Sequence, residues 1–131
     1  MTNKTDIGKI GEAMAVEYLQ KKGYRILHRN YRIGHLEIDI ICENETHLLF
    51  VEVKSRTDFG GTSRYGRPSA AVDEKKRARL LAAAEAYLRT YQENKKPRID
   101  VIEVYLSRYG GMYTLAPKGI HHIENAVWGG Q

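Results

Sequence analysis

The chain has 131 residues, of which 42% are apolar, so it has the size of one ordinary domain and can bury a core. Lys and Arg outnumber Asp and Glu by 21 to 16, which favours an anionic partner without requiring one. The single Cys42 excludes an internal disulfide and a cysteine-based zinc site, and no apolar run is long enough for a signal peptide or a membrane span. We expect a cytoplasmic protein with no membrane partner, folded as one domain over residues 1–131 with flexible tails at 1–5 and 128–131.

The first half of the chain predicts one helix and three strands. Apolar residues recur at helical spacing over 7–22, which predicts a helix. Residues 24–31 are predicted to form a strand, strict alternation predicts another over 36–40, and the nearly continuous apolar run 47–54 predicts a third. The short polar turn at 43–46 indicates that the last two strands form an antiparallel hairpin.

The second half predicts a loop, a helix and two strands. Residues 56–68 contain three glycines among basic and hydroxyl residues and show no periodicity, so we expect a mobile surface loop. Apolar spacing predicts a second helix from about 70 to 93, a strand over 98–106 and a hairpin partner over 112–115, followed by an irregular or edge segment to 128. This order of elements predicts an α/β or α+β fold, with a central mixed β-sheet flanked by helices.

Charged residues on the predicted hairpin form the candidate site. Side chains alternate along a strand, so Glu52 and Lys54 project to the same face. If the hairpin loop has an even number of residues, Asp39 lies on that face as a direct or diagonal neighbour of Glu52, close enough to share one ion. An odd loop without a compensating bulge would separate the two carboxylates.

Carboxylates crowded beside apolar residues repel each other and lose hydration unless a cation compensates them. Oxygen ligands suit Mg²⁺ or Mn²⁺ better than zinc, and Lys54 adds a positive charge beside the water that such an ion would activate. This is the chemistry of phosphodiester hydrolysis. Taken alone, Glu52 and Lys54 fit an ordinary solvent-facing ion pair better, but Asp39 and the flanking apolar runs favour the metal site.

Asp39, followed by Glu52–Val53–Lys54 on the next strand, resembles the PD-(D/E)xK signature of restriction-endonuclease-like nucleases, with Ile38 in place of the proline. A larger set of motifs resembles, in order and spacing, the bacterial YraN-like family over about residues 8–127. These motifs are Gly8-x-x-Gly11–Glu12, Gly34-x-x-Glu37–Ile38–Asp39, the run from Phe50 to Arg56, Arg64–Tyr65–Gly66, Lys75–Lys76, the run from Arg98 to Val101, and the run from His122 to Ala126.

The resemblance implies a restriction endonuclease-like fold, similar to archaeal Holliday junction resolvases, with elements in the order helix-strand-strand-strand-helix-strand. It implies that Asp39 and Glu52 are metal ligands and that Lys54 is the catalytic lysine. By the same resemblance, Glu12 is a catalytic residue that completes the metal site. From periodicity alone, Glu12 is as readily a surface residue as a site residue.

Two basic segments are the candidate nucleic-acid contacts. The composition of 56–68 suits contact with a phosphate backbone, and Tyr65 can stack on a base or sugar, although the segment also fits an exposed connector. Basic residues in the first half of the second helix lie where the helix dipole disfavours positive charge, so a bound anion and a solvated basic face explain them equally well. The candidates are Arg56, Arg64, Tyr65, Arg67, Lys75, Lys76 and Arg79.

The sequence leaves three functions open. The first is an endonuclease that depends on Mg²⁺ or Mn²⁺ and acts on DNA, including branched DNA and as a homodimer if the likeness to resolvases extends to substrate. The second is a non-catalytic nucleic-acid-binding module on a nuclease-like fold, and the third is a small basic protein that binds another protein through its second helix. We expect structural roles for Asp100 with Arg98, and for His121 and His122.

Overall fold

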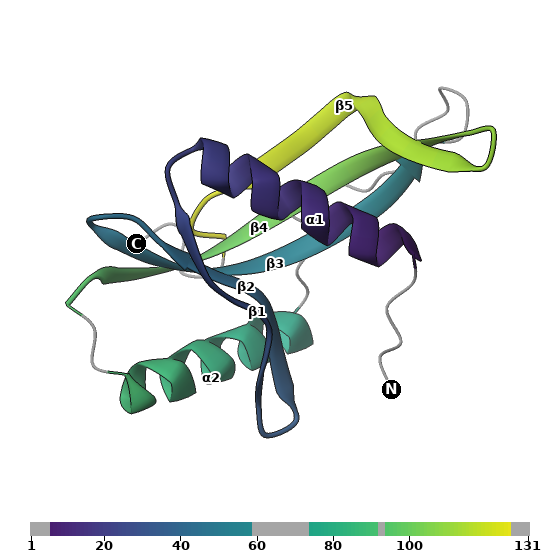
Figure 1. Cartoon of the computed structure of the whole chain (residues 1–131). Helices are drawn as coiled ribbons and strands as arrows, with labels where there is room; N and C mark the ends of the chain where they lie inside the picture. The colour runs from purple at the N-terminus through teal and green to yellow at the C-terminus, as the bar shows by residue number, and fades with distance from the viewer. Residues whose placement is uncertain (1–5, 59–73, 92–93, 127–131) are drawn as a thin grey trace.

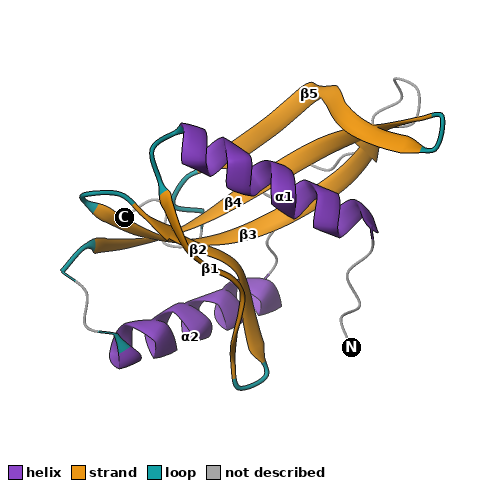
Figure 2. Ribbon diagram, viewed as in Figure 1, coloured by secondary structure: helices purple, strands orange, loops and turns teal. Residues whose placement is uncertain are grey.

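A five-stranded mixed sheet forms the centre of the protein, with a helix on each face (Figure 1 and Figure 2). The computed structural model describes residues 6–58, 74–91 and 94–126. Its elements in chain order are α1 (Asp6–Lys21), β1 (Arg25–Ile33), β2 (Leu36–Glu43), β3 (His47–Asp58), α2 (Glu74–Thr90), β4 (Lys96–Tyr109) and β5 (Met112–Ile123). These strands lie side by side in sequence order, and β3 and β4 are parallel while the other neighbouring pairs are antiparallel. The α/β class with a mixed sheet and flanking helices is therefore confirmed.

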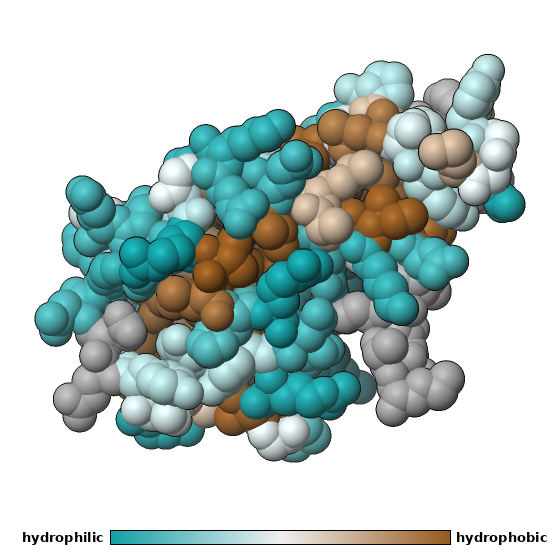
Figure 3. All heavy atoms as spheres, viewed as in Figure 1, coloured by the Kyte–Doolittle hydropathy of each residue, from teal (hydrophilic) through white to brown (hydrophobic). Residues whose placement is uncertain are grey.

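An apolar core lies beneath each helix. The core beneath α2 includes Leu80 and Tyr87 of the helix with Ile38, Phe50 and Ile99 of the sheet. The core beneath α1 includes Ala15 and Leu19 of the helix with Ile40, Val51 and Ile102 of the sheet. Because the central strands are covered on both faces, β3 and β4 carry nearly continuous apolar runs instead of an alternating pattern. Figure 3 shows further apolar side chains in a band across the face that carries α1.

The alternation of side chains between the two faces of the sheet is broken in β2 next to Asp39. Ile38 and Ile41 belong to the core beneath α2, whereas Ile40 belongs to the core beneath α1. Strict alternation would place Ile38 with Ile40, so this part of the alternation expected over 36–40 is wrong. On β1, Asn30 lies between the partners of these two isoleucines and has a left-handed φ of 52°, a conformation that asparagine tolerates. Neighbouring strands are thus irregular at the level of Asp39.

Gly11 allows α1 to approach β3 closely. A Cβ atom on Gly11 would lie 1.8 Å from Oγ of Ser55 and 3.0 Å from its Cβ. Glycine inside a helix costs about 1 kcal/mol relative to alanine, and this close approach explains why it is present here.

We expect Gly11→Ala to destabilise the protein by about 1–3 kcal/mol, because both side-chain atoms of Ser55 would have to move. The urea-unfolding midpoint measures the change. Adding Ser55→Ala removes the closer atom and should restore part of the loss. Equal destabilisation in the single and double variants would show that the clash with Ser55 is not the cause.

The two helices and five strands expected from the sequence are present, while several boundaries differ from expectation. Strand β3 continues to Asp58 by pairing with β4, so residues 56–58 are strand and not loop, and 59–68 lie outside the described residues. Helix α2 begins at Glu74, and the expected helical residues 70–73 and 92–93 lie outside the described part, as do the tails at 1–5 and 128–131. Strand β5 continues to Ile123 at an edge of the sheet, so of the two alternatives expected after residue 115 the edge segment is confirmed as far as Ile123. No helix in the described ranges is long and apolar enough to cross a membrane.

Candidate functional site

A cavity of about 280 Å³ lies between the β1–β2 hairpin, β3 and the first half of α2. Its wall includes Asp39 from β2, Glu52 from β3, and Lys76 and Arg79 from α2. The pairing of Glu43 with Leu48 leaves four residues, 44–47, in the loop of the β2–β3 hairpin, so the number of loop residues is even. The expectation that Asp39 and Glu52 come together on one face is confirmed as geometry.

The ladder of backbone hydrogen bonds between β2 and β3 stops beside Asp39. Its last paired residues are Ile40 and Val51. Beyond them, the N–H of Val53 donates to Oδ2 of Asp39 at 2.8 Å. The carboxylate takes the place of a backbone acceptor, and this bond fixes Asp39 against β3 at the edge of the cavity.

Two lysines from different elements meet the carboxylate of Glu52. The side chain of Glu52 is 7% exposed, and its Oε2 lies 2.7 Å from Nζ of Lys76 on α2. The same oxygen lies 3.7 Å from Nζ of Lys54, two residues further along β3. The site therefore combines two buried carboxylates with two half-buried ammonium groups.

Burial and neighbouring charges perturb three of these groups. Burial raises the pKa of the Glu52 carboxyl above its ordinary value of 4.5, and the charge of Asp39 adds to this effect while Lys76 and Lys54 oppose it. Burial lowers the pKa of Lys54 from its ordinary 10.5, although Glu52 favours the charged form. Burial also acts against the charge of Lys76, but its hydrogen bond and ion pair with Glu52 outweigh it and raise the pKa. Perturbed pKa values in a polar cavity are typical of functional sites.

The donor set of the cavity fits a hard divalent cation. Asp39 and Glu52 supply carboxylate oxygens, which Mg²⁺ and Mn²⁺ prefer, and their buried charges gain from a bound cation. Mg²⁺ is commonly held by one or two carboxylates, with water and substrate phosphates as the remaining ligands. Within the described residues, no group of three or more His, Cys, Asp or Glu side chains is close enough to hold a metal ion. This pair would therefore act as a two-carboxylate site.

Glu12 does not line the cavity that holds Asp39 and Glu52. It lies in α1, which packs on the opposite face of the sheet from α2, and it is buried with 4% of its surface exposed. Burial excludes the ordinary surface role, since a charged glutamate is rarely buried without a partner or a task. Its part in metal binding stays a prediction of the family resemblance.

The expected nucleic-acid contacts fall into separate places. Lys75 and Arg79 are exposed on α2, and Arg79 also lines the cavity, whereas Lys76 points into the site itself. Arg56 lies near the end of β3, half-buried, with its Nη2 3.6 Å from Oε2 of Glu103. Arg64, Tyr65 and Arg67 lie outside the described residues.

Glu103 is a candidate site residue that was not predicted from the sequence. It is fully buried in β4, in register with Lys54 of β3, and its Oε1 accepts a 2.7 Å hydrogen bond from the hydroxyl of Tyr105. Its carboxylate helps to hold Arg56. The sequence signal for Glu103 is a carboxylate inside the apolar run of residues 99–106. The sequence could not predict which residues contact Glu103, because those contacts depend on the parallel register of β3 and β4.

Comparison with known proteins identifies the family. The model of the uncharacterised protein family UPF0102 matches residues 11–104. The chain belongs to this family. It is 38% identical to the UPF0102 protein of Caldanaerobacter subterraneus subsp. tengcongensis over 125 residues, which cover 95% of this chain and 96% of that relative. It is 42% identical to the UPF0102 protein of Clostridioides difficile over 125 residues, covering 95% and 98%. The resemblance to the YraN-like family is thereby confirmed.

The residues that line the cavity, and Lys54 beside it, all lie inside the part that matches the UPF0102 model. Asp39, Glu52, Lys54 and Lys76 fall within residues 11–104, and so does Glu12. The polar end of β5 lies beyond the matched range, although a relative from Phocaeicola vulgatus is 37% identical over 128 residues, or 98% of this chain.

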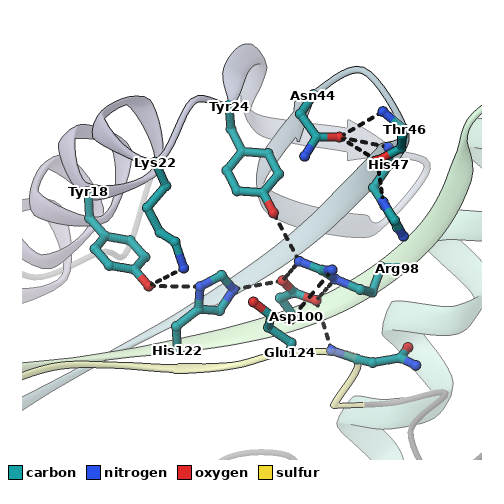
Figure 4. Close-up of polar contacts among 11 residues, drawn as sticks. Tyr18, Lys22, Tyr24, Asn44, Thr46, His47, Arg98, Asp100, His122 and Glu124 are labelled. Atoms are coloured by element: carbon teal, nitrogen blue, oxygen red, sulfur yellow. Dashed lines mark hydrogen bonds and ion pairs between the residues drawn. The ribbon is translucent and has the colours of Figure 1, made fainter.

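A second polar network in this UPF0102 protein joins α1, β4 and β5 (Figure 4). Arg98 donates to both carboxylate oxygens of Asp100 at 3.0 Å, and Nε2 of His122 lies 2.7 Å from Oδ2 of Asp100. The other ring nitrogen of His122 lies 2.9 Å from the hydroxyl of Tyr18 on α1. A neutral His122 with its proton on Nε2 satisfies both contacts. The expected pairing of Asp100 with Arg98 is confirmed, and His122 contacts the same carboxylate.

Proposed function

We propose that this protein is a metal-dependent endonuclease that hydrolyses phosphodiester bonds of DNA on a restriction endonuclease-like fold. The observation that carries the proposal is the cavity lined by the buried carboxylates of Asp39 and Glu52, where Glu52 meets the ammonium groups of Lys76 from the cavity wall and of Lys54 beside it. Carboxylates that could hold Mg²⁺ or Mn²⁺, beside cations that could bind a phosphate, are the parts that metal-assisted phosphodiester hydrolysis requires.

The residues of the cavity divide the chemistry between them. Asp39 and Glu52 would hold the metal ion, which polarises a phosphoryl oxygen and lowers the pKa of bound water when it is present. The hydrogen bond from the N–H of Val53 keeps the Asp39 carboxylate in place. Lys54, on the same face as Glu52, would place a positive charge beside the attacked phosphate and stabilise the negative charge that develops in the transition state. The assignment of Glu12 as a third metal ligand rests on the family resemblance alone.

The surface beside the cavity supports an anionic polymer as the substrate. Lys75 and Arg79 are exposed on the first two turns of α2, beside the cavity wall that Lys76 and Arg79 form. Arg56, with 31% of its side chain exposed, is a further cation on the strand that carries Glu52 and Lys54. The likeness to Holliday junction resolvases leads us to propose branched DNA as a substrate and a homodimer as the active form, because a symmetric junction requires two cuts.

A substrate panel tests the proposed activity. Linear duplex, single-stranded and four-way-junction DNA, and the corresponding RNAs, are incubated with Mg²⁺ or Mn²⁺ and analysed for cleavage. We expect cleavage of at least one DNA substrate, and Lys54→Ala should lower its rate by at least about 100-fold because a charge at the reaction centre is lost. Lys96→Ala, at an exposed lysine at the start of β4, should leave the rate unchanged.

One observation favours the second candidate, a non-catalytic nucleic-acid-binding module. Lys76 already neutralises Glu52 at 2.7 Å, so the carboxylate could serve only to anchor a basic helix. Binding that weakens steeply with salt, with no cleavage anywhere in the panel, would favour this function and overturn the endonuclease.

A further inference from the structure

Lys76 already contacts the oxygen of Glu52 that a metal ion would need as a ligand. Its Nζ lies 2.7 Å from Oε2 of Glu52, closer than that of Lys54 at 3.7 Å. The side chains reach this oxygen from two different elements, Lys76 from α2 and Lys54 from the strand that also carries Glu52. An ammonium group and a divalent cation cannot both lie against this oxygen without strong repulsion.

The formal charges of the site show what a metal ion would change. Glu37, Asp39 and Glu52 contribute three negative charges, and Lys54, Lys76 and Arg79 contribute three positive charges, so the site is balanced. A divalent cation added to this arrangement would leave an excess of two positive charges around two buried carboxylates. Such an excess is unfavourable in a partly buried cavity, where water screens charges weakly.

Lys76 can leave the site by a movement of its own side chain. It has a flexible four-carbon stem, its side chain is 30% exposed, and α2 is joined to the sheet by other, apolar side chains. Exposed basic residues flank it at Lys75 and Arg79, so a phosphate group arriving at this surface would meet Lys76 within reach. A phosphate brings the negative charge that a metal ion and a displaced lysine both need.

We propose that Lys76 is a built-in counter-cation of the Asp39–Glu52 pair, which weakens divalent-cation binding until a nucleic-acid phosphate draws the lysine away. This inference rests on the proposed function, because the cation site is that of the endonuclease. Metal and nucleic acid then strengthen each other's binding by the same factor, as linkage requires. The protein would hold a metal ion weakly when it is alone and firmly on its substrate.

The test measures Mn²⁺ binding to the full chain without nucleic acid, by calorimetry and by the electron spin resonance of free Mn²⁺. Lys76→Met keeps most of the stem and removes the charge, so we expect it to tighten Mn²⁺ binding by at least about 5-fold. Lys75→Met removes the same charge from the neighbouring exposed position and should change the affinity much less.

A second arm measures the coupling. A short DNA duplex with phosphorothioate linkages, which are cleaved slowly, should tighten Mn²⁺ binding to the wild type and to Lys75→Met. The same duplex should tighten binding to Lys76→Met far less, because there the competing charge is already gone.

Asp39→Asn separates the failure of this inference from the failure of the proposed function. Absence of Mn²⁺ binding in both the wild type and Lys76→Met, or binding that survives Asp39→Asn, would overturn the metal site and the inference together. Binding that depends on Asp39 but is unchanged or weaker in Lys76→Met would overturn the counter-cation role alone.

Discussion

Asp39→Asn is expected to lower metal-dependent DNA cleavage by about 10²–10³-fold, the usual effect of losing one charge-stabilising group at a reaction centre. The substitution removes the negative charge that would hold the metal ion. It keeps an oxygen that can accept the hydrogen bond from the N–H of Val53, so the local fold should survive. Cleavage is measured at saturating Mg²⁺ on whichever DNA the panel identifies, and circular dichroism with a salt series checks that fold and DNA binding persist.

Glu37→Gln is the matched control for this variant. Glu37 is another carboxylate of β2 at the wall of the same cavity, and it is converted to an amide in the same way. We expect it to retain cleavage, because the ion pairs of the site converge on Glu52. Full activity of Asp39→Asn, or equal losses in both variants, would remove Asp39 from the metal site.

The meeting of Asp39 and Glu52 could be predicted from the sequence because it depends on local rules. The apolar runs define the two strands, the polar turn between them defines a hairpin, and the parity of the loop decides which residues share a face. The irregularity at Asp39 could not be predicted in this way. It involves Asn30 on the neighbouring strand, and a left-handed asparagine has no periodic signature.

The contact between Lys76 and Glu52 could not be predicted, for a different reason. The sequence shows that Lys75, Lys76 and Arg79 lie in the first half of a helix, and the structure agrees. Which of them points at Glu52 depends on the rotation of α2 about its axis and on its distance from β3. The cores beneath the two helices set both quantities, and those contacts join residues far apart in the chain.

The length of β5 and the partners of Glu103 depend on the sheet as a whole. Residues 116–123 have little apolar alternation because β5 lies at an edge, where polar residues are favoured. Glu103 meets Arg56 and lies in register with Lys54 only because β3 and β4 are parallel. Sequence periodicity can predict that a strand exists, but not which strand will lie beside it.

Asp100→Ala is expected to have the largest effect on stability, about 3–5 kcal/mol, because it breaks a buried ion pair by removing one partner. Asp100 is fully buried and receives hydrogen bonds from Arg98, from His122 and from the N–H of Asn125 at 2.9 Å. Its loss would leave the guanidinium of Arg98, whose side chain is only 15% exposed, without its main counter-charge. Urea unfolding measures the difference in the free energy of unfolding.

Glu124→Ala provides the matched control, since Glu124 is a second carboxylate partner of the same Arg98. Its contact is longer, at 3.6 Å, and its side chain is 53% exposed, so we expect a loss of at most about 1 kcal/mol. Similar losses in the two variants would show that burial of the Asp100 network is not what stabilises this end of the sheet.

The effect of Asp100→Ala should also depend on pH in a defined direction. Burial acts to raise the pKa of Asp100, but hydrogen bonds from His122, Arg98 and the backbone of Asn125 outweigh it and hold the pKa below its ordinary value of 3.8. A lowered folded-state pKa stabilises the fold fully above the unfolded-state value and loses this contribution as the pH falls through the folded-state value. The difference between wild type and variant should therefore be constant near neutral pH and shrink below about pH 4. A difference that instead grew on acidification would mean that Asp100 is not the ionised centre of the network.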